Sequence, residues 1–401
     1  MGFPLEFELV EDEQALAQLV QRMASARLIA LDTEFVGEYS YRPQLCLIQL
    51  ALCPDARRRP ELVVVDPRRL KQLDPFWEQL ASGNHRTVVH AGRQEYVFCW
   101  RRVGRGPARL MDVQVAAGLV GLEYPAGYSN LVQRLLGTSS GKRETRTDWR
   151  RRPLSKAQLQ YALEDVVHLP AMARQLDRLL AEKGRTAWLE EEMQRWEAEV
   201  QHQLERETWR RLSGLSGLDR RQLAVARQLW QWRNQVAQQQ NRRPGQILRD
   251  DLLVELARRA SSDPAQIVAV RGMEWKRFRR HVDQIARQID QALALPEQQW
   301  PEPLRRSAAS QYGTLSQLLY AVLSCHCRRA EVAPALVGTP NELRQWVAQQ
   351  LGAGSGESSA LDHGWRRQLL GTLLEDLLAG RLSVWVQEPE SDTPLSWQRR
   401  K

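Results

Sequence analysis

The sequence lacks any apolar segment long enough to cross a membrane. No run in its 401 residues reaches the length of about 18 apolar residues that would predict a transmembrane helix. The opening MGFPLEFELVEDE has no basic segment before an apolar core, and its sixth residue is neither Ser nor Thr. We therefore expect neither a secretory signal nor N-myristoylation.

Cysteine is scarce, and its spacing does not predict a disulfide framework. The five cysteines include Cys46 and Cys99, which lie in apolar runs and are expected to be small buried hydrophobes. Cys325-His326-Cys327 has no second pair at a zinc-like distance, so we expect no structural zinc there. This cysteine usage is typical of a reducing compartment, and we expect a cytoplasmic protein.

Acidic residues are outnumbered by basic ones. The chain has 57 Lys and Arg against 48 Asp and Glu, a formal net charge of +9, and a pI near 9.6. This excess favours a polyanionic partner, with nucleic acid as the first candidate. With 26% charged and 43% apolar residues the composition is that of globular domains, and the length predicts two or three of them.

The first half of the chain predicts a mixed sheet. Apolar runs predict five strands, at 27–34, 45–51, 61–66, 87–90 and 109–112. No helix fits between the first three, which should therefore pair as an antiparallel meander. Helical periodicity is expected at 11–23, 69–82 and 91–103, and helices dominate up to about residue 180. The outcome is a mixed five-stranded α/β sheet flanked by helices.

Two carboxylates stand at the end of the first predicted strand. Asp32 and Glu34 are two residues apart, so both side chains leave the same face of the strand. Carboxylates this close repel unless a cation lies between them, and oxygen ligands suit Mg²⁺ or Mn²⁺. Taken alone, the pattern fits a strand that ends in a polar loop equally well.

Further acidic residues follow along the chain. Glu95 comes in the first turn of the helix after the fourth strand, where a carboxylate is also stabilised by the helix dipole. Tyr161 and Asp165 are four residues apart, so on a helix they share one face. Asp112 is a spare acid whose place before a helical run favours an N-cap role.

The order of these motifs resembles the DEDD exonuclease superfamily in its tyrosine variant, and within it the ribonuclease D family. D-x-E on a first strand, an acid after a fourth strand and Y-x-x-x-D on a late helix form the shared set. Further segments resemble ribonuclease D, namely Pro43–Leu50, Met111–Ala117 and Thr145–Ser155. The resemblance implies a ribonuclease H-like fold for about half of the chain.

The resemblance also implies roles for individual residues. Asp32 would bridge two divalent ions, Mg²⁺ or Mn²⁺; Glu34 and Asp165 would complete the first site and Glu95 would serve the second. Tyr161 would orient the attacking water. The family has aspartate where this chain has Glu95, which adds one methylene. We expect this change to slow catalysis, and loss of catalysis is the alternative.

Four other residues are candidates for substrate binding. Phe35 follows the acidic pair and could wedge against the terminal base, or be a core residue. His90 ends the fourth strand, where a hydrogen-bonded structural role competes with substrate contact. Arg146 and Arg150 lie in the basic segment 141–152, which could carry a phosphate backbone or be a solvated loop.

The second half of the chain is helical. After an exonuclease domain at 1–187, residues 188–207 predict a connecting helix and 208–295 resemble an HRDC domain, a small helical bundle that supports nucleic-acid binding in the family. Its last helix, expected from Trp275 to Ala292, has a basic face, for which simple solvation is the alternative. Residues 305–386 resemble a second HRDC-like, all-α domain. The polar tail 387–401 is expected to be disordered.

These observations lead to one main functional hypothesis and two alternatives. The leading hypothesis is a metal-dependent, monomeric 3′–5′ exoribonuclease that trims RNA with a single-stranded 3′ end, with transfer RNA precursors as the family-implied substrate. One alternative is a catalytically weakened RNA-binding protein. The other is a DNA exonuclease of the same superfamily.

Overall fold

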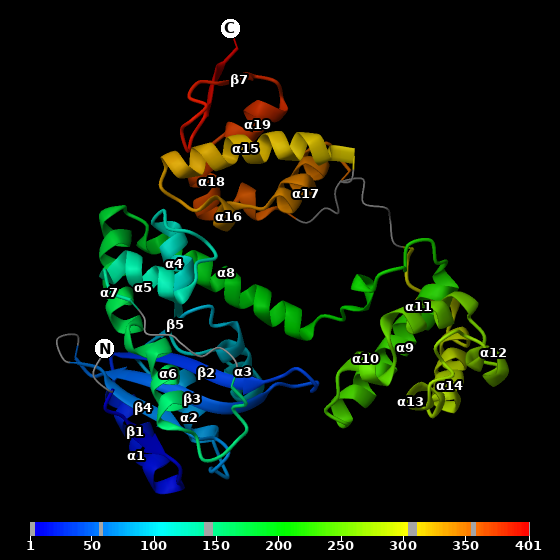
Figure 1. Ribbon diagram of the computed structural model, residues 1–401. Helices are drawn as coiled ribbons and strands as arrows, with labels where there is room; N and C mark the ends of the chain where they lie inside the picture. Colours follow the sequence, from blue (N-terminus) through cyan, green and yellow to red (C-terminus); the bar gives the residue numbers. More distant parts are fainter. Residues whose placement is uncertain (1–4, 56–58, 140–146, 304–310, 354–357, 401) are drawn as a thin grey trace. The chain divides into compact units, whose positions relative to one another are not determined.

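The computed structural model describes residues 5–55, 59–139, 147–303, 311–353 and 358–400. By contacts the chain divides into two units (Figure 1). One unit comprises residues 1–34, 45–202 and 308–401. The other comprises 35–44 and 203–307. The division does not follow chain order, because the C-terminal helical module belongs to the same unit as the N-terminal sheet.

The first unit is built on a six-stranded mixed sheet with the order β1-β4-β3-β2-β5-β6. β3 pairs antiparallel with β4, whereas β1 with β4, β2 with β5, and β5 with β6 pair in parallel. The predicted mixed sheet is confirmed, with one strand more than expected, because the three residues of β1 are too few for a periodic signal. The strands are β1 Glu8–Val10, β2 Leu28–Val36, β3 Gln44–Cys53, β4 Glu61–Val65, β5 Arg86–Val89 and β6 Met111–Asp112.

Apolar faces and caps explain the helices of this domain. In α1, Leu16, Leu19 and Met23 are buried at helical spacing, and the Asp12 side chain accepts a hydrogen bond from the first turn. α3 ends at Gly104, whose left-handed backbone suits glycine. The helices are α1 Glu13–Ser25, α2 Asp74–Ser82, α3 Arg93–Val103, α4 Val113–Leu119, α5 Tyr128–Leu136, α6 Lys156–Val167, α7 Leu169–Glu182 and α8 Thr186–Glu205.

The C-terminal module of this unit is helical and ends in a hairpin. Its helices are α15 Gly313–Arg329, α16 Pro334–Val337, α17 Pro340–Gln350, α18 Gly364–Leu370 and α19 Leu373–Leu378. β7 Leu382–Val386 then pairs antiparallel with β8 Leu395–Arg399. The prediction of an all-α domain with a disordered tail is therefore wrong for these residues. The Trp397 ring lies 6.1 Å from the His326 ring and 4.8 Å from the Arg329 guanidinium, contacts that hold the polar tail in place.

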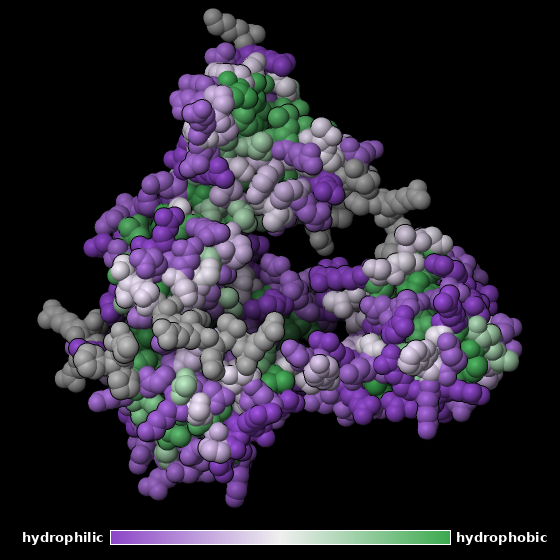
Figure 2. Space-filling model, in the orientation of Figure 1, coloured by the Kyte–Doolittle hydropathy of each residue, from purple (hydrophilic) through white to green (hydrophobic). Residues whose placement is uncertain are grey.

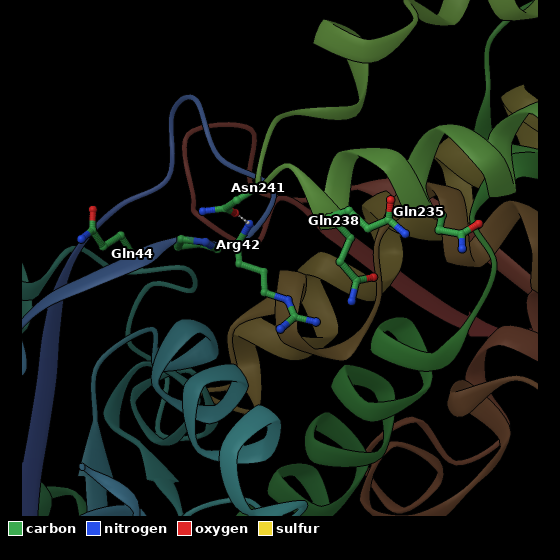
Figure 3. A pocket seen from close by; sticks show the side chains of 7 residues that line it. Arg42, Gln44, Gln235, Gln238 and Asn241 are labelled. Carbon is green, nitrogen blue, oxygen red and sulfur yellow. Dashed lines mark hydrogen bonds between the residues drawn. The ribbon is translucent and has the colours of Figure 1, made fainter. Parts of the chain in front are cut away.

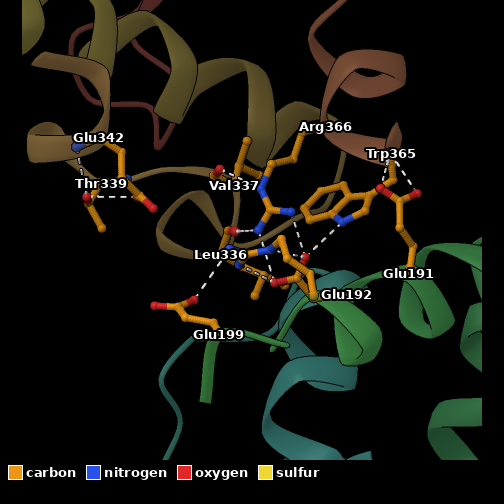
Figure 4. A network of polar contacts seen from close by, with 10 residues as sticks. Glu191, Glu192, Glu199, Leu336, Val337, Thr339, Glu342, Trp365 and Arg366 are labelled. Atoms are coloured by element: carbon orange, nitrogen blue, oxygen red, sulfur yellow. Dashed lines mark hydrogen bonds and ion pairs between the residues drawn. The ribbon is translucent and has the colours of Figure 1, made fainter. Parts of the chain in front are cut away.

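A buried polar network joins the module to α8 (Figure 4). The Glu192 carboxylate accepts hydrogen bonds from Arg366 at 2.6 and 3.0 Å and from the Trp365 indole at 3.0 Å. Arg195, on the same helix, donates to it at 2.6 Å. Burial alone would raise the pKa of Glu192, but the hydrogen bonds from Arg366 and Arg195 outweigh burial and lower it.

The second unit contains a helical bundle around one apolar core. Leu223, Leu229, Leu253 and Phe278 are among its fully buried members. The basic helix predicted over 275–292 is interrupted at Arg280 and His281, so it forms α13 and α14 rather than one rod. The helices are α9 Arg220–Gln239, α10 Pro244–Ile247, α11 Asp250–Arg259, α12 Pro264–Val268, α13 Lys276–Arg279 and α14 Val282–Leu293.

All five cysteines are unpaired and buried, which confirms the burial predicted for Cys46 and Cys99. The Nε2 atom of His326 lies 2.7 Å from the Leu369 carbonyl oxygen, in the middle of the Cys-His-Cys sequence. Burial raises the pKa of the Cys99 and Cys327 thiols to about 12.

Among the described residues, no helix combines the length and apolarity that a membrane span requires. Figure 2 shows a face covered mainly by hydrophilic residues, with smaller hydrophobic areas.

Candidate active site

Three carboxylates from two elements form a compact group. Asp32 and Glu34 extend from β2, and Asp165 comes from the last turn of α6. Their ligand atoms all lie within 4.8 Å of one another. The structure thus brings together Glu34 and Asp165, which are 131 positions apart in the chain and which the resemblance to the DEDD exonucleases assigns to one metal site.

The capped N-terminus of α6 fixes where Asp165 lies. The Ser155 side chain accepts from the Gln158 backbone while the Gln158 side chain accepts from the Ser155 backbone, a capping box. Leu159, Ala162, Leu163 and Val166 form the buried face of the helix. This packing leaves the acid on the half-buried side.

The electrostatics of this group fit a divalent cation. Burial raises the pKa of Asp32 well above its ordinary value, and repulsion from Glu95, Asp165 and Glu34 raises it further. A cation among the three carboxylates would relieve this repulsion. Carboxylate oxygens are the donors that hard divalent ions prefer. The donor set therefore fits a bound divalent metal ion.

Glu95 lies nearby but outside the compact group. It occupies the first turn of α3, is 4% exposed, and accepts a hydrogen bond from the Thr33 hydroxyl. Burial raises its pKa to about 7, against the lowering effect of the Thr33 hydrogen bond. Thr33 lies between the two acids of β2 in the sequence. The fourth acid is thus oriented by a residue that the motifs do not include.

Asp112 holds the turn that positions Glu95. Its carboxylate accepts N–H groups from Ala91 at 3.1 Å and Gly92 at 3.0 Å, and it caps α4 through Gln114 at 2.9 Å. The predicted N-cap role is confirmed. Ala91 has a left-handed backbone, with φ of 54°. A Cβ at position 92 would lie 2.2 Å from a Val89 methyl group, so only glycine fits this turn.

Two aromatic rings lie beside the carboxylates. Tyr161, one turn before Asp165 on α6, has its ring 6.3 Å from that of the buried Trp149. Tyr128, which the sequence analysis missed, donates its hydroxyl to the Glu164 carbonyl oxygen at 2.6 Å. Burial, followed by the charge of Asp165, raises the pKa of Tyr128. No motif marks Tyr128, because it meets α6 only through the fold.

The four predicted substrate contacts fall in different settings. Phe35 is 39% exposed at the end of β2, which does not fit a core residue. The Nε2 atom of His90 lies 2.8 Å from the Ala126 carbonyl oxygen, as expected for a hydrogen-bonded strand end. The Arg150 guanidinium donates to Asp148 at 2.8 Å on the surface. Arg146 lies outside the described residues. Contact of these residues with substrate stays a prediction.

One member of the basic segment has a structural role instead. Arg152 donates to the Asp66 carboxylate, at 2.7 Å through Nη2, and to the Cys46 carbonyl oxygen at 2.8 Å. The side chains of Arg152 and Asp66 are 16% and 2% exposed. The charge count of the segment could not show this, because the partner lies 86 residues earlier in the chain.

Comparisons with known proteins point to one family. A family model described as 3′-5′ exonuclease matches residues 7–181, and an HRDC domain model matches residues 222–289. Ribonuclease D of Desulfotalea psychrophila is 31% identical over 367 residues, covering 90% of this chain and 96% of that protein. The chain belongs to the ribonuclease D family. Its members include ribonuclease D of Zymomonas mobilis, 32% identical over 95% of this chain and 96% of its own.

A solved ribonuclease D has the same architecture. The crystal structure of Escherichia coli RNase D matches with a TM-score of 0.82 at 25% identity, covering 94% of this chain and 99% of that one. The chain is therefore a 3′–5′ exoribonuclease, a hydrolase with a mixed-sheet exonuclease domain followed by a helical HRDC region. The fold class and the activity predicted from the motifs are confirmed.

Proposed function

We propose that the chain hydrolyses RNA from the 3′ end by a two-metal mechanism and releases nucleoside 5′-monophosphates. The observation that carries this proposal is the meeting of Asp32, Glu34 and Asp165 within 4.8 Å. These residues would hold a first divalent ion, and Asp32 would also contact a second. When bound, Mg²⁺ or Mn²⁺ would supply an activated water and neutralise charge on the leaving 3′-oxygen.

The remaining site residues orient the reactants. Tyr161 lies one turn from Asp165 and is backed by Trp149, so its hydroxyl would position the attacking water. A phenol loses its proton only near pH 10, so it orients water rather than acting as a base. Glu95, held by Thr33, would reach the second ion through an intervening water, because it lies outside the compact group.

RNA with a single-stranded 3′ end is the substrate that the surface chemistry supports best. The HRDC region carries an exposed cationic helix, α13, with Lys276, Arg277 and Arg279 beside Trp275, which is 59% exposed. Exposed cations with an aromatic ring are the usual means of holding a nucleic-acid strand. The E. coli enzyme is described as an exoribonuclease involved in structured RNA processing. Transfer RNA precursors are the proposed substrates of this chain.

The proposed setting is the cytoplasm, with the chain acting as a monomer. Five unpaired, buried cysteines support a reducing compartment.

A trimming assay tests this function. The purified protein is incubated with a 3′-extended transfer RNA and Mg²⁺ or Mn²⁺, and products are resolved with and without EDTA. We expect mononucleotides that disappear with EDTA and in Asp32→Ala but persist in Asp290→Ala, a change at an exposed acid of α14. Binding without trimming under either metal would instead support the weakened RNA-binding protein. Preference for a DNA strand of the same sequence would support a DNA exonuclease.

A further inference from the structure

A surface pocket lies in the second unit, between the β2–β3 turn and the end of α9 (Figure 3). Its volume is about 770 Å³. The segment 35–44 contains the end of β2 and the β2–β3 turn, and it follows directly after Glu34 in the chain. The pocket is lined by Arg42, Pro43, Gln44, Gln235, Gln238, Gln239 and Asn241.

The turn is fixed to α9 by specific contacts. The Arg42 backbone N–H donates to the Asn241 side chain at 3.0 Å. Asn241 ends the helix in a left-handed conformation, with φ of 46°, which asparagine tolerates better than most residues. Tyr41 packs against the apolar core of the bundle. These contacts hold the backbone of the turn against α9 and leave most side chains that line the pocket exposed to solvent.

The chemistry of the lining is that of a nucleic-acid contact. Five of the lining side chains are amides, which donate and accept at once and so suit base edges and the ribose 2′-hydroxyl. Figure 3 shows the side chains of Arg42 and Gln238 extending from their two elements toward the pocket. Arg42 lies in the turn and Arg242 and Arg243 follow α9, whereas residues 35–44 contain one acid, Glu38. Within the described part of the chain, none of these three arginines has an ion pair.

An exposed aromatic ring completes this surface. Tyr39, on the same turn, is 69% exposed, and the Arg243 guanidinium lies 6.0 Å from its ring. Leaving a large ring in water costs free energy unless a partner covers it. A ring flanked by a cation is a stacking platform for a base, and such stacking tolerates any sequence.

We propose that Tyr39, with Arg42, Arg243 and the amides of the α9 end, binds the single-stranded RNA segment upstream of the scissile end. Tyr39 stacks on one base, the arginines contact phosphates, and the amides contact ribose and base edges. The inference rests on the proposed function, because the 3′ end must lie at Asp32 and Glu34. Tyr39 is five residues beyond Glu34, about 17 Å at full extension. With stacked bases about 3.4 Å apart, this is within about five nucleotides of the 3′ end.

The decisive measurement is the dependence of hydrolysis on RNA length. The specificity constant kcat/KM is measured for the shortest oligoribonucleotide that the wild type hydrolyses and for the same 3′ end extended up to about ten nucleotides. We expect Tyr39→Ala to lower kcat/KM on the long RNA by about tenfold. The shortest RNA should be unaffected, because it cannot reach the ring. Tyr39→Trp should restore the long-RNA value.

Two further arms separate this proposal from the proposed function. Trp385→Ala, at an exposed ring of the C-terminal hairpin that is 40% exposed, should behave as wild type at every length. Binding of a labelled ten-nucleotide RNA is also measured by fluorescence anisotropy in the Asp32→Asn background. If the wild type hydrolyses nothing but Tyr39→Ala still weakens binding, the proposed function fails and this surface stands. If Tyr39→Ala changes neither binding nor the length dependence, the surface is refuted.

Discussion

At the residue scale, the acidic site shows what a motif can specify and what it cannot. The i, i+2 spacing on a strand and the i, i+4 spacing on a helix predicted that Asp32 and Glu34, and Tyr161 and Asp165, would share faces. Both spacings are local, so the fold needed only to bring two elements together. The Thr33 hydroxyl on Glu95 joins residues 62 positions apart, and no local pattern contains it.

The length of the Glu95 side chain is the first property to test. Its carboxylate accepts from Thr33 and lies outside the group of three acids. Glu95→Asp removes one methylene and matches the family pattern, and we expect kcat to rise, on the order of tenfold, because small misplacements at a reacting centre are costly. Single-turnover kinetics under saturating Mg²⁺ would measure this. Thr33→Val is the companion variant, and we expect it to lower kcat because it removes the hydrogen bond to Glu95. An unchanged kcat in both Glu95→Asp and Thr33→Val would show that the Glu95 side chain has no part in the reaction.

A second prediction at the residue scale concerns the stabilising role of Arg152. Arg152→Met leaves the Asp66 carboxylate, which is 2% exposed, without its guanidinium partner. We expect a loss of about 3 kcal/mol in the free energy of unfolding, because breaking a buried pair strands a charge. Urea unfolding monitored by tryptophan fluorescence gives the value. Arg151→Met is the matched control, since that side chain is 84% exposed, and equal stability of the two variants would contradict the assignment.

At the element scale, long amphipathic segments were predictable and short pairings were not. The predicted helices at 11–23 and 91–103 correspond to α1 and α3 to within two residues at either end. β1 has three residues, and β8 is mostly polar, so neither carries an alternation long enough to recognise. β8 exists because β7 pairs with it and Trp397 packs on α15, and these are contacts between elements.

The junction of α8 with α18 gives a prediction on pH. The pKa of Glu192 lies below its ordinary value of 4.5 in the folded chain. Its stabilising effect is therefore complete above that ordinary value and is lost as pH falls through the lower, folded pKa. Glu192→Gln should lower the free energy of unfolding by about 3 kcal/mol at pH 7. The difference from wild type should shrink steadily below about pH 4.5.

Urea unfolding of both proteins across this pH range provides the measurement. Glu191→Gln is a useful companion, because among the described residues Glu191 accepts only from the backbone N–H of Trp365. Its difference from wild type should be smaller at pH 7. A difference between wild type and Glu192→Gln that grows on acidification would have the wrong sign and would refute the ion pair as its source.

At the scale of the whole molecule, chain order and spatial grouping differ. The sequence predicted three successive domains, but the C-terminal module groups by contacts with the exonuclease domain, and the bundle between them forms its own unit. Arg185 shows why the sequence could not reveal this. It donates to the carbonyl oxygens of Leu119 at 2.8 Å and Glu331 at 2.7 Å, partners 66 and 146 residues away.

A truncation tests this grouping. A chain ending at Pro303 lacks Arg366, Trp365 and the carbonyl oxygen of Glu331, so Glu192 and Arg185 each lose partners. We expect the melting temperature of the exonuclease domain to fall by about 10 °C, since roughly 3 kcal/mol corresponds to such a shift in a domain of this size. Differential scanning calorimetry would resolve it. The control is a chain that lacks only residues 388–401, and its melting temperature should fall less. An unchanged melting temperature in the chain ending at Pro303 would show that the C-terminal module does not stabilise the exonuclease domain.

The burial of every thiol has a practical consequence. Because burial raises the pKa of the Cys99 and Cys327 thiols to about 12, an alkylating reagent at neutral pH finds almost no thiolate at these two positions in the native protein. Cys46, Cys53 and Cys99 lie in the exonuclease domain, Cys325 and Cys327 lie in the C-terminal module, and none lies in the bundle of the second unit. The rate at which each cysteine is alkylated, measured by mass spectrometry of its peptide, would therefore report the local unfolding of the exonuclease domain and of the C-terminal module separately. No engineered label is needed. The native cysteines therefore serve as probes of local unfolding.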